Sequence, residues 1–419
     1  MKLQTPSFIQ RSSSLPSSSS SAAGARSPRT QELSQTTETK LGSRRWAIFA
    51  ALTLVVVGSL NEYQIFYQLH RASAQEFIDI AHGVLLGHPP WRAFQARLFG
   101  PLTFAALESC MHWLQAGSPT LYRMIERVFR DPDDTRSLAV FNAFGACLIL
   151  TTNLVAFALL LRYSKSLIKA IGGTLFASLL FVMLSDHWIY SWDFFEQLFF
   201  FVFAYSMFTN RKADTGFFLL YALTLANRES AAFFGVWLLC SVFSNKLIHD
   251  RMLWLRTMLG VGLVGIAIFY VVALRNALFI ESTLGHETGY SLGATALALG
   301  DGVRLHQAFG NHLMLFGNVI QFFKNLVTSR FYVDVYVALI AWHGLFLARL
   351  GLKWRSSQIM AIGMFNTILL VSILNFGVLN ETRMYLICIP MLVFSVVTFA
   401  PQWLSFLMRI DQQFALSRR

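Results

Sequence analysis

The residues most able to do chemistry gather in one stretch, Gln75 to Leu102, which reads QEFIDIAHGVLLGHPPWRAFQARLFGPL. Glu76 and Asp79 are three positions apart and would share one face of a helix. Either carboxylate is a candidate general base, and a solvated helix face explains the same pair. Arg92 and Arg97 carry the guanidinium groups that bind phosphate well. Because apolar regions flank the stretch, we expect it to meet a lipid-linked substrate beside a membrane.

Charged pairs also occupy short connections between apolar runs. These are Arg228-Glu229 and Glu381-Arg383, and Asp193 precedes a further apolar run. Arginines in short outer connections oppose the usual topological preference for cytoplasmic positive charge, which favours a functional use. Two interpretations stay open: the pairs line a substrate cavity and contact its phosphate, or they are ion pairs that tie helix ends together.

The composition excludes an ordinary soluble domain. Of the 419 residues 55% are hydrophobic and 13% are charged, with a net charge of +12, whereas soluble domains carry roughly 25% charged residues. The basic residues form small clusters between apolar runs, as topology signals do, so no nucleic-acid partner is expected. The four cysteines have neither disulfide-framework nor zinc-ligand spacing, and no metal site is predicted.

We therefore expect an all-α polytopic membrane protein with about ten spans. Residues 1–43 are rich in Ser, Thr and Pro and should form a disordered cytoplasmic tail, although an organelle transit peptide has a similar composition. Residues 44–404 form the membrane domain and 405–419 a short basic cytoplasmic tail. The expected apolar runs are Trp46 to about Phe66, Leu138–Leu161, Ala170–Leu184, Phe194–Phe208, Gly216–Ala226, Ala231–Phe243, Met258–Phe279, Tyr332–Leu347, Ile359–Leu379 and Met384–Leu404.

Alternating these runs across a membrane places most basic clusters and both termini in the cytoplasm, as in a bacterial inner membrane. Two large loops, residues 70–136 and 281–330, then lie on the non-cytoplasmic side. Each contains an apolar piece, Leu98–Leu114 and Leu313–Val327, that we expect to lie along the membrane surface as a helix. Gly216–Ala226 and Ala231–Phe243 are too short to cross alone and should form a helical hairpin with a polar tip at residues 227–230.

The first outer loop resembles that of the C-type (GT-C) glycosyltransferase superfamily, whose members have many spans and two large outer loops. The residues that carry the resemblance are an aromatic, an Ala, an apolar pair with Gly, a Pro-aromatic-basic triplet and a Pro-Leu pair: Phe77, Ala81, Leu85-Leu86-Gly87, Pro90-Trp91-Arg92 and Pro101-Leu102. The resemblance implies an inverting transfer of a sugar from a polyprenyl-phosphate donor to an acceptor hydroxyl.

In that chemistry a carboxylate of the first outer loop takes the acceptor proton, and cations hold the departing phosphate. The family often has an acidic residue shortly before the aromatic, where this chain has Ser73-Ala74. The base is therefore either displaced to Glu76 or Asp79 or absent. Many such sites use a divalent cation, but the sequence shows no clear ligand set for one. The expected partners are a lipid-linked sugar donor and membrane lipids.

Two functions of other classes compete with the transferase. A non-catalytic membrane scaffold or assembly partner would explain the absent acidic residue at Ser73-Ala74. A transporter or flippase of a lipid-linked precursor would require charges in the middle of spans and repeated halves, and His343 is the one mid-span candidate that we identify from the sequence.

Overall fold

The structure, a computed structural model, describes residues 28–85, 97–129, 135–185, 190–209, 213–244, 251–278, 315–328, 339, 357–376 and 385–399. Every regular element in these ranges is a helix, as the sequence predicts. The helices are α1 (Pro28–Leu85), α2 (Phe99–Gly117), α3 (Pro119–Phe129), α4 (Arg136–Ser164), α5 (Leu167–Leu184), α6 (Ser191–Phe208), α7 (Thr215–Asn227), η2 (Glu229–Ala231), α8 (Ala232–Ser244), α9 (Arg251–Leu278), α12 (Leu315–Thr328), α14 (Ser357–Phe376) and a short final helix, Cys388–Phe399.

Five of the described helices are long and apolar enough to cross a membrane, which identifies an integral membrane protein. They are Trp46–Gln68 within α1, Arg136–Ser164, Leu167–Leu184, Leu253–Tyr270 and Gln358–Asn375. Each coincides with an expected run. The arrangement with about ten spans stays a prediction, because the expected run 332–347 lies outside the described residues apart from Leu339, and other expected runs form shorter helices.

Helix α1 is longer than the sequence analysis expects at both ends. It begins at Pro28, inside the segment expected to be disordered, and continues to Leu85, well into the expected outer loop. No glycine or proline occurs between Gly58 and Gly83, so nothing in this polar stretch terminates the helix. Residues 1–50 and 51–419 form two separate units, and the contacts described below lie within the second.

The expected outer loop is largely helical in its described parts. Residues 98–114, expected to form a surface-lying helix, belong to α2, and α3 follows after Ser118. Pro101 lies in the first turn of α2 and Pro119 starts α3, where a missing backbone N–H does not interrupt the helical hydrogen bonds. The second expected surface helix, at residues 313–327, is α12. Whether these helices lie along a membrane surface stays a prediction.

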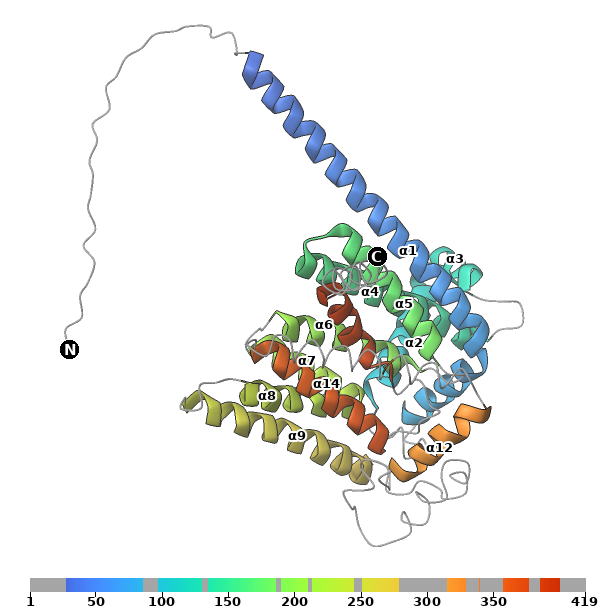
Figure 1. Cartoon of the computed structure of the whole chain (residues 1–419). Helices are drawn as coiled ribbons and strands as arrows, with labels where there is room; N and C mark the ends of the chain where they lie inside the picture. Colours follow the sequence, from blue (N-terminus) through green and yellow to red (C-terminus); the bar gives the residue numbers. More distant parts are fainter. Residues whose placement is uncertain are drawn as a thin grey trace, which may run out of the picture. The chain divides into compact units, whose positions relative to one another are not determined.

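Aromatic residues of α6 form the centre of the core. Helix α6 packs against α4 and α7, while α8 lies beside both α9 and α14 (Figure 1). The Phe203 ring stacks on Phe234 of α8 with 4.1 Å between centroids. At the α8–α9 contact, a Cβ added to Gly235 would lie 2.5 Å from the carbonyl oxygen of Gly260. The two helix backbones therefore approach as closely as glycine permits.

Candidate functional site

Arg228 is the centre of a buried ionic cluster. It is the C-cap residue of α7 and has an extended backbone, so its side chain leaves the helix axis at the turn before η2. Its Nη1 donates to Asp193 Oδ1 at 3.1 Å and to Glu196 Oε2 at 2.7 Å. Both acids are almost fully buried, at 1% and 0% exposure. The guanidinium therefore places a positive charge between two carboxylates that are buried away from water.

The start of α6 places these acids. Asp193 and Glu196 are three residues apart and face the same side of the helix. Asp193 Oδ2 also accepts a hydrogen bond from the backbone N–H of Tyr190 at 3.1 Å. Asn227 Nδ2 donates to the Trp192 carbonyl at 2.8 Å, so the end of α7 is fixed to the start of α6. Asp193 thus both caps α6 and binds the arginine.

Glu229 connects a second arginine to this cluster. Arg97 Nη2 donates to Glu229 Oε1 at 3.1 Å, and the same oxygen lies 3.9 Å from Arg228 Nε. The Arg97 guanidinium also stands 5.4 Å from the ring centroid of Trp192. Leu98 N donates to the Ala226 carbonyl at 3.2 Å, which holds the start of α2 against the end of α7. Residues 132 positions apart in the chain are brought together in this way.

The cluster contains four of the predicted site residues: Arg97, Asp193, Arg228 and Glu229. The sequence analysis does not select Glu196 as a site residue; its position one turn after Asp193 is the signal that could have done so. Glu229 is the most accessible member, with 29% of its side chain exposed. Solvent therefore reaches the cluster on the Glu229 side.

The two predicted base residues lie on α1. Gln75 Nε2 donates to Asp79 Oδ1 at 3.0 Å, and Asp79 is exposed. Glu76 is half-buried. Phe77, between them, is fully buried and packs against Trp192 with 5.6 Å between ring centroids. Asp79 is two positions beyond Phe77, so it points to the opposite side of α1 from the Trp192 contact.

The remaining predicted site residues, Arg92, Glu381 and Arg383, lie outside the described residues. Within the described ranges, no group of three or more His, Cys, Asp or Glu side chains is arranged to hold a metal ion. Comparisons with family models, curated proteins and solved structures found no match to this chain. The site is therefore interpreted from its own chemistry.

A junction of α1, α2 and α4 provides a second polar cluster. Glu108 lies 2.8 Å from His82 Nε2 through one carboxylate oxygen and accepts a hydrogen bond from Ser137 Oγ at 2.6 Å through the other. Burial raises the pKa of Glu108, but these two hydrogen bonds and the charges of His82 and His112 lower it by more than burial raises it. The pKa of Glu108 therefore lies below the ordinary value of 4.5. The carboxylate is thus held in its ionised form.

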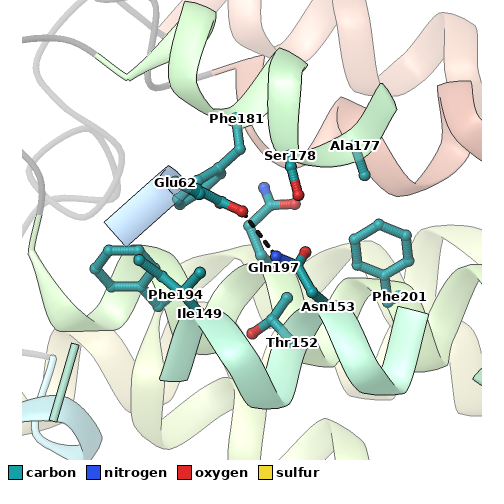
Figure 2. A pocket seen from close by; sticks show the side chains of 10 residues that line it. All are labelled: Glu62, Ile149, Thr152, Asn153, Ala177, Ser178, Phe181, Phe194, Gln197 and Phe201. Carbon is teal, nitrogen blue, oxygen red and sulfur yellow. Dashed lines mark hydrogen bonds between the residues drawn. The ribbon is translucent and has the colours of Figure 1, made fainter. Parts of the chain in front are cut away.

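A third cluster, which sequence reasoning missed entirely, surrounds Glu62 inside the first candidate span. Helices α1, α4, α5 and α6 enclose a small cavity there (Figure 2). Asn153 Nδ2 donates to Glu62 Oε2 at 2.7 Å and to Ser59 Oγ at 3.0 Å. Glu62 is 5% exposed. Glu62 itself is the signal in the sequence, because an acid within an apolar run is rare and usually functional. The sequence analysis treats the whole run only as an apolar span.

Proposed function

We propose that this protein is a membrane glycosyltransferase that moves a sugar from a polyprenyl-phosphate donor to an acceptor hydroxyl on the non-cytoplasmic side. One observation carries the proposal: Arg97, from the segment that resembles the glycosyltransferase loop, meets the Arg228-Glu229 turn in a single ionic cluster. Guanidinium groups from separate segments are the arrangement expected for a site that holds a departing phosphate.

The proposed reaction is a single displacement. The acceptor oxygen attacks the anomeric carbon and forms the new glycosidic bond, while the bond from that carbon to the phosphate oxygen breaks and polyprenyl phosphate leaves. A carboxylate, Asp79 or Glu76, takes the acceptor proton. Arg97 and Arg228 bind the leaving phosphate after Glu229 moves aside, because Glu229 is the partly exposed carboxylate that shares them.

Packing brings helix α1 beside the arginine cluster through Phe77, although Asp79 faces the opposite side of α1. Phe77, between the two base candidates, contacts Trp192, and Arg97 stands over the same indole ring. The helix that carries the base and the residues that bind phosphate therefore touch the same aromatic side chain. In this proposal the donor phosphate enters beside Glu229, the partly exposed member of the cluster.

The test uses purified full-length protein in proteoliposomes with a panel of short-chain polyprenyl-phosphate sugars. Asp79→Asn and Glu76→Gln are made separately, and one of them should lower turnover by about 10²- to 10⁴-fold, the usual contribution of a general base. Asp214→Ser is the matched control, because it removes an exposed carboxylate yet keeps a residue able to cap α7 as Asp214 does. Normal transfer by both variants would remove the proposed base.

Arg97→Gln separates substrate binding from structure. It should raise the donor KM by about tenfold or more, since a charge-assisted hydrogen bond contributes about 1.5–3 kcal/mol. Folded yield should be kept and the thermal midpoint should fall modestly, because Arg97 is buried but its partner Glu229 is partly solvated. A large loss of folded protein with an unchanged donor KM would instead identify the cluster as a structural ion pair.

A transporter of a lipid-linked precursor is the second candidate, and one observation favours it. Glu62 is an acid inside the candidate span Trp46–Gln68, where charges mark ion or substrate pathways. The same proteoliposomes distinguish the two functions. A transporter moves labelled donor across the bilayer without forming a glycoside, whereas the transferase forms a glycoside without net movement of donor.

A further inference from the structure

We propose that the cavity beside Glu62 is a binding site for a single sodium ion. The site is separate from the arginine cluster and does not rest on the proposed transferase activity. It combines a buried carboxylate, hydroxyl and amide oxygens from three other helices, and room for one small particle. Figure 2 shows the side chains of Glu62, Asn153, Ser178 and Gln197 directed toward one another.

Glu62 is a buried carboxylate without a charged partner among the described residues of the cavity lining. Glu62 is 5% exposed and lies in a span, where an uncompensated carboxylate costs several kcal/mol. The ten residues that line the cavity include no lysine, arginine or histidine. Asn153 donates a hydrogen bond to the carboxylate but carries no charge. Among the described residues that line the cavity none supplies a positive charge, so a bound ion or a proton would neutralise Glu62.

Several oxygen atoms of the cavity lining could bind a cation. The Asn153 amide nitrogen donates to Glu62 and Ser59, so the amide also brings its carbonyl oxygen to the lining. Gln197 donates its amide nitrogen to the Leu386 carbonyl and likewise contributes a carbonyl oxygen to the lining. Thr152 is buried in the same lining, and its hydroxyl has no hydrogen-bond partner within the described structure. Carboxylate, carbonyl and hydroxyl oxygens are the donors that hard cations prefer.

The volume of the cavity and its single carboxylate limit the size and the charge of the ion. The centre of a water-sized particle can occupy about 10 Å³ of the cavity, which is room for one such particle. A single carboxylate balances one positive charge, whereas divalent cations such as calcium are usually held by several carboxylates. A protonated Glu62 would instead leave the space to one water molecule, and the experiment below distinguishes this case. A monovalent ion smaller than a water molecule, such as sodium, satisfies both the charge and the space.

The experiment measures the thermal midpoint of the full-length protein in detergent, in sodium chloride and in choline chloride at equal ionic strength. Sodium should raise the midpoint, and at about 100 times its dissociation constant it should raise the folded-to-unfolded ratio about 100-fold. Glu62→Gln should abolish the shift, and Thr152→Val should weaken it while removing no charge. Binding of radioactive sodium to the same proteins provides a readout that does not depend on unfolding.

Glu108→Gln is the matched control, because it removes a hydrogen-bonded carboxylate from a different cluster and should keep the full sodium shift. Equal wild-type midpoints in sodium and choline, with no radioactive sodium bound, would overturn the proposal. So would a sodium shift that persists in Glu62→Gln. A midpoint that depends on pH but not on sodium would identify a proton-binding site in place of the sodium site. If Glu62→Gln does not fold, the loss of sodium binding in Thr152→Val decides.

Discussion

Replacing Arg228 with methionine tests the ionic cluster most directly. Methionine keeps much of the side-chain volume but removes both hydrogen bonds to Asp193 and Glu196. Asp193 and Glu196 are 1% and 0% exposed, so water cannot replace the guanidinium. Removing one partner from a buried ion pair typically costs about 3–5 kcal/mol. We expect Arg228→Met to lower the free energy of unfolding by about this amount.

Arg97→Met provides the comparison. Arg97 is 8% exposed and its partner Glu229 29%, so this ion pair is less buried than those of Arg228 and should contribute about 1 kcal/mol. The contact with Trp192 adds roughly 0.5–1 kcal/mol. The two substitutions remove the same charge from neighbouring positions, and their effects should still differ by about 2 kcal/mol or more because burial of the partners differs.

The measurement is unfolding in mixed micelles with increasing denaturing detergent, followed by circular dichroism. A third protein, with Arg228→Met, Asp193→Asn and Glu196→Gln together, removes the stranded charges and should regain much of the lost stability. Arg228→Met with wild-type stability would refute the reasoning, as would a triple variant no more stable than Arg228→Met alone. Either result would mean that burial of these acids does not depend on the guanidinium.

Two further predictions concern other parts of the fold. The lowered pKa of Glu108 means that its stabilising contribution is complete above its ordinary value of 4.5 and is lost as the pH falls through the lowered pKa. The difference in thermal midpoint between wild type and Glu108→Gln should therefore shrink below pH 4.5; a difference that grows on acidification would contradict the assigned direction. Gly235→Ala should cost about 1–3 kcal/mol, because the added Cβ meets the Gly260 backbone. Gly262→Ala, with nothing within 4 Å, should be neutral or gain up to about 1 kcal/mol, and detergent unfolding compares the two.

Continuous apolar runs predicted the helical class and the approximate positions of the five long apolar helices, because crossing lipid requires continuous apolar length. They also predicted the two short helices on either side of Arg228. They did not predict the extent of α1, since a polar stretch without glycine or proline can either continue a helix or form a loop after it. The number of spans was the least determined quantity, because runs of intermediate length fit a span or a shorter helix equally well.

The sequence identified most residues of the ionic cluster but not which of them contact one another. Charge in short connections marked Arg228 and Glu229, but nothing local specifies that Arg97 lies beside them. Such contacts depend on how helices pack, which sequence spacing does not encode across 132 positions. Glu62 was missed for a different reason: its run is apolar on average, and Asn153 and Gln197, which complete its surroundings, lie in two other runs.

Helix α6 physically links the two buried polar clusters. Glu196 binds Arg228, and the next residue, Gln197, lines the Glu62 cavity. Consecutive residues on a helix point about 100° apart and move together, because the backbone hydrogen bonds make the helix nearly rigid. A rotation of α6 that withdraws Gln197 from the cavity must also displace Glu196 from Arg228. An ion that holds Gln197 in place therefore also stabilises the arginine cluster, and loss of Arg228 should in turn weaken ion binding at Glu62.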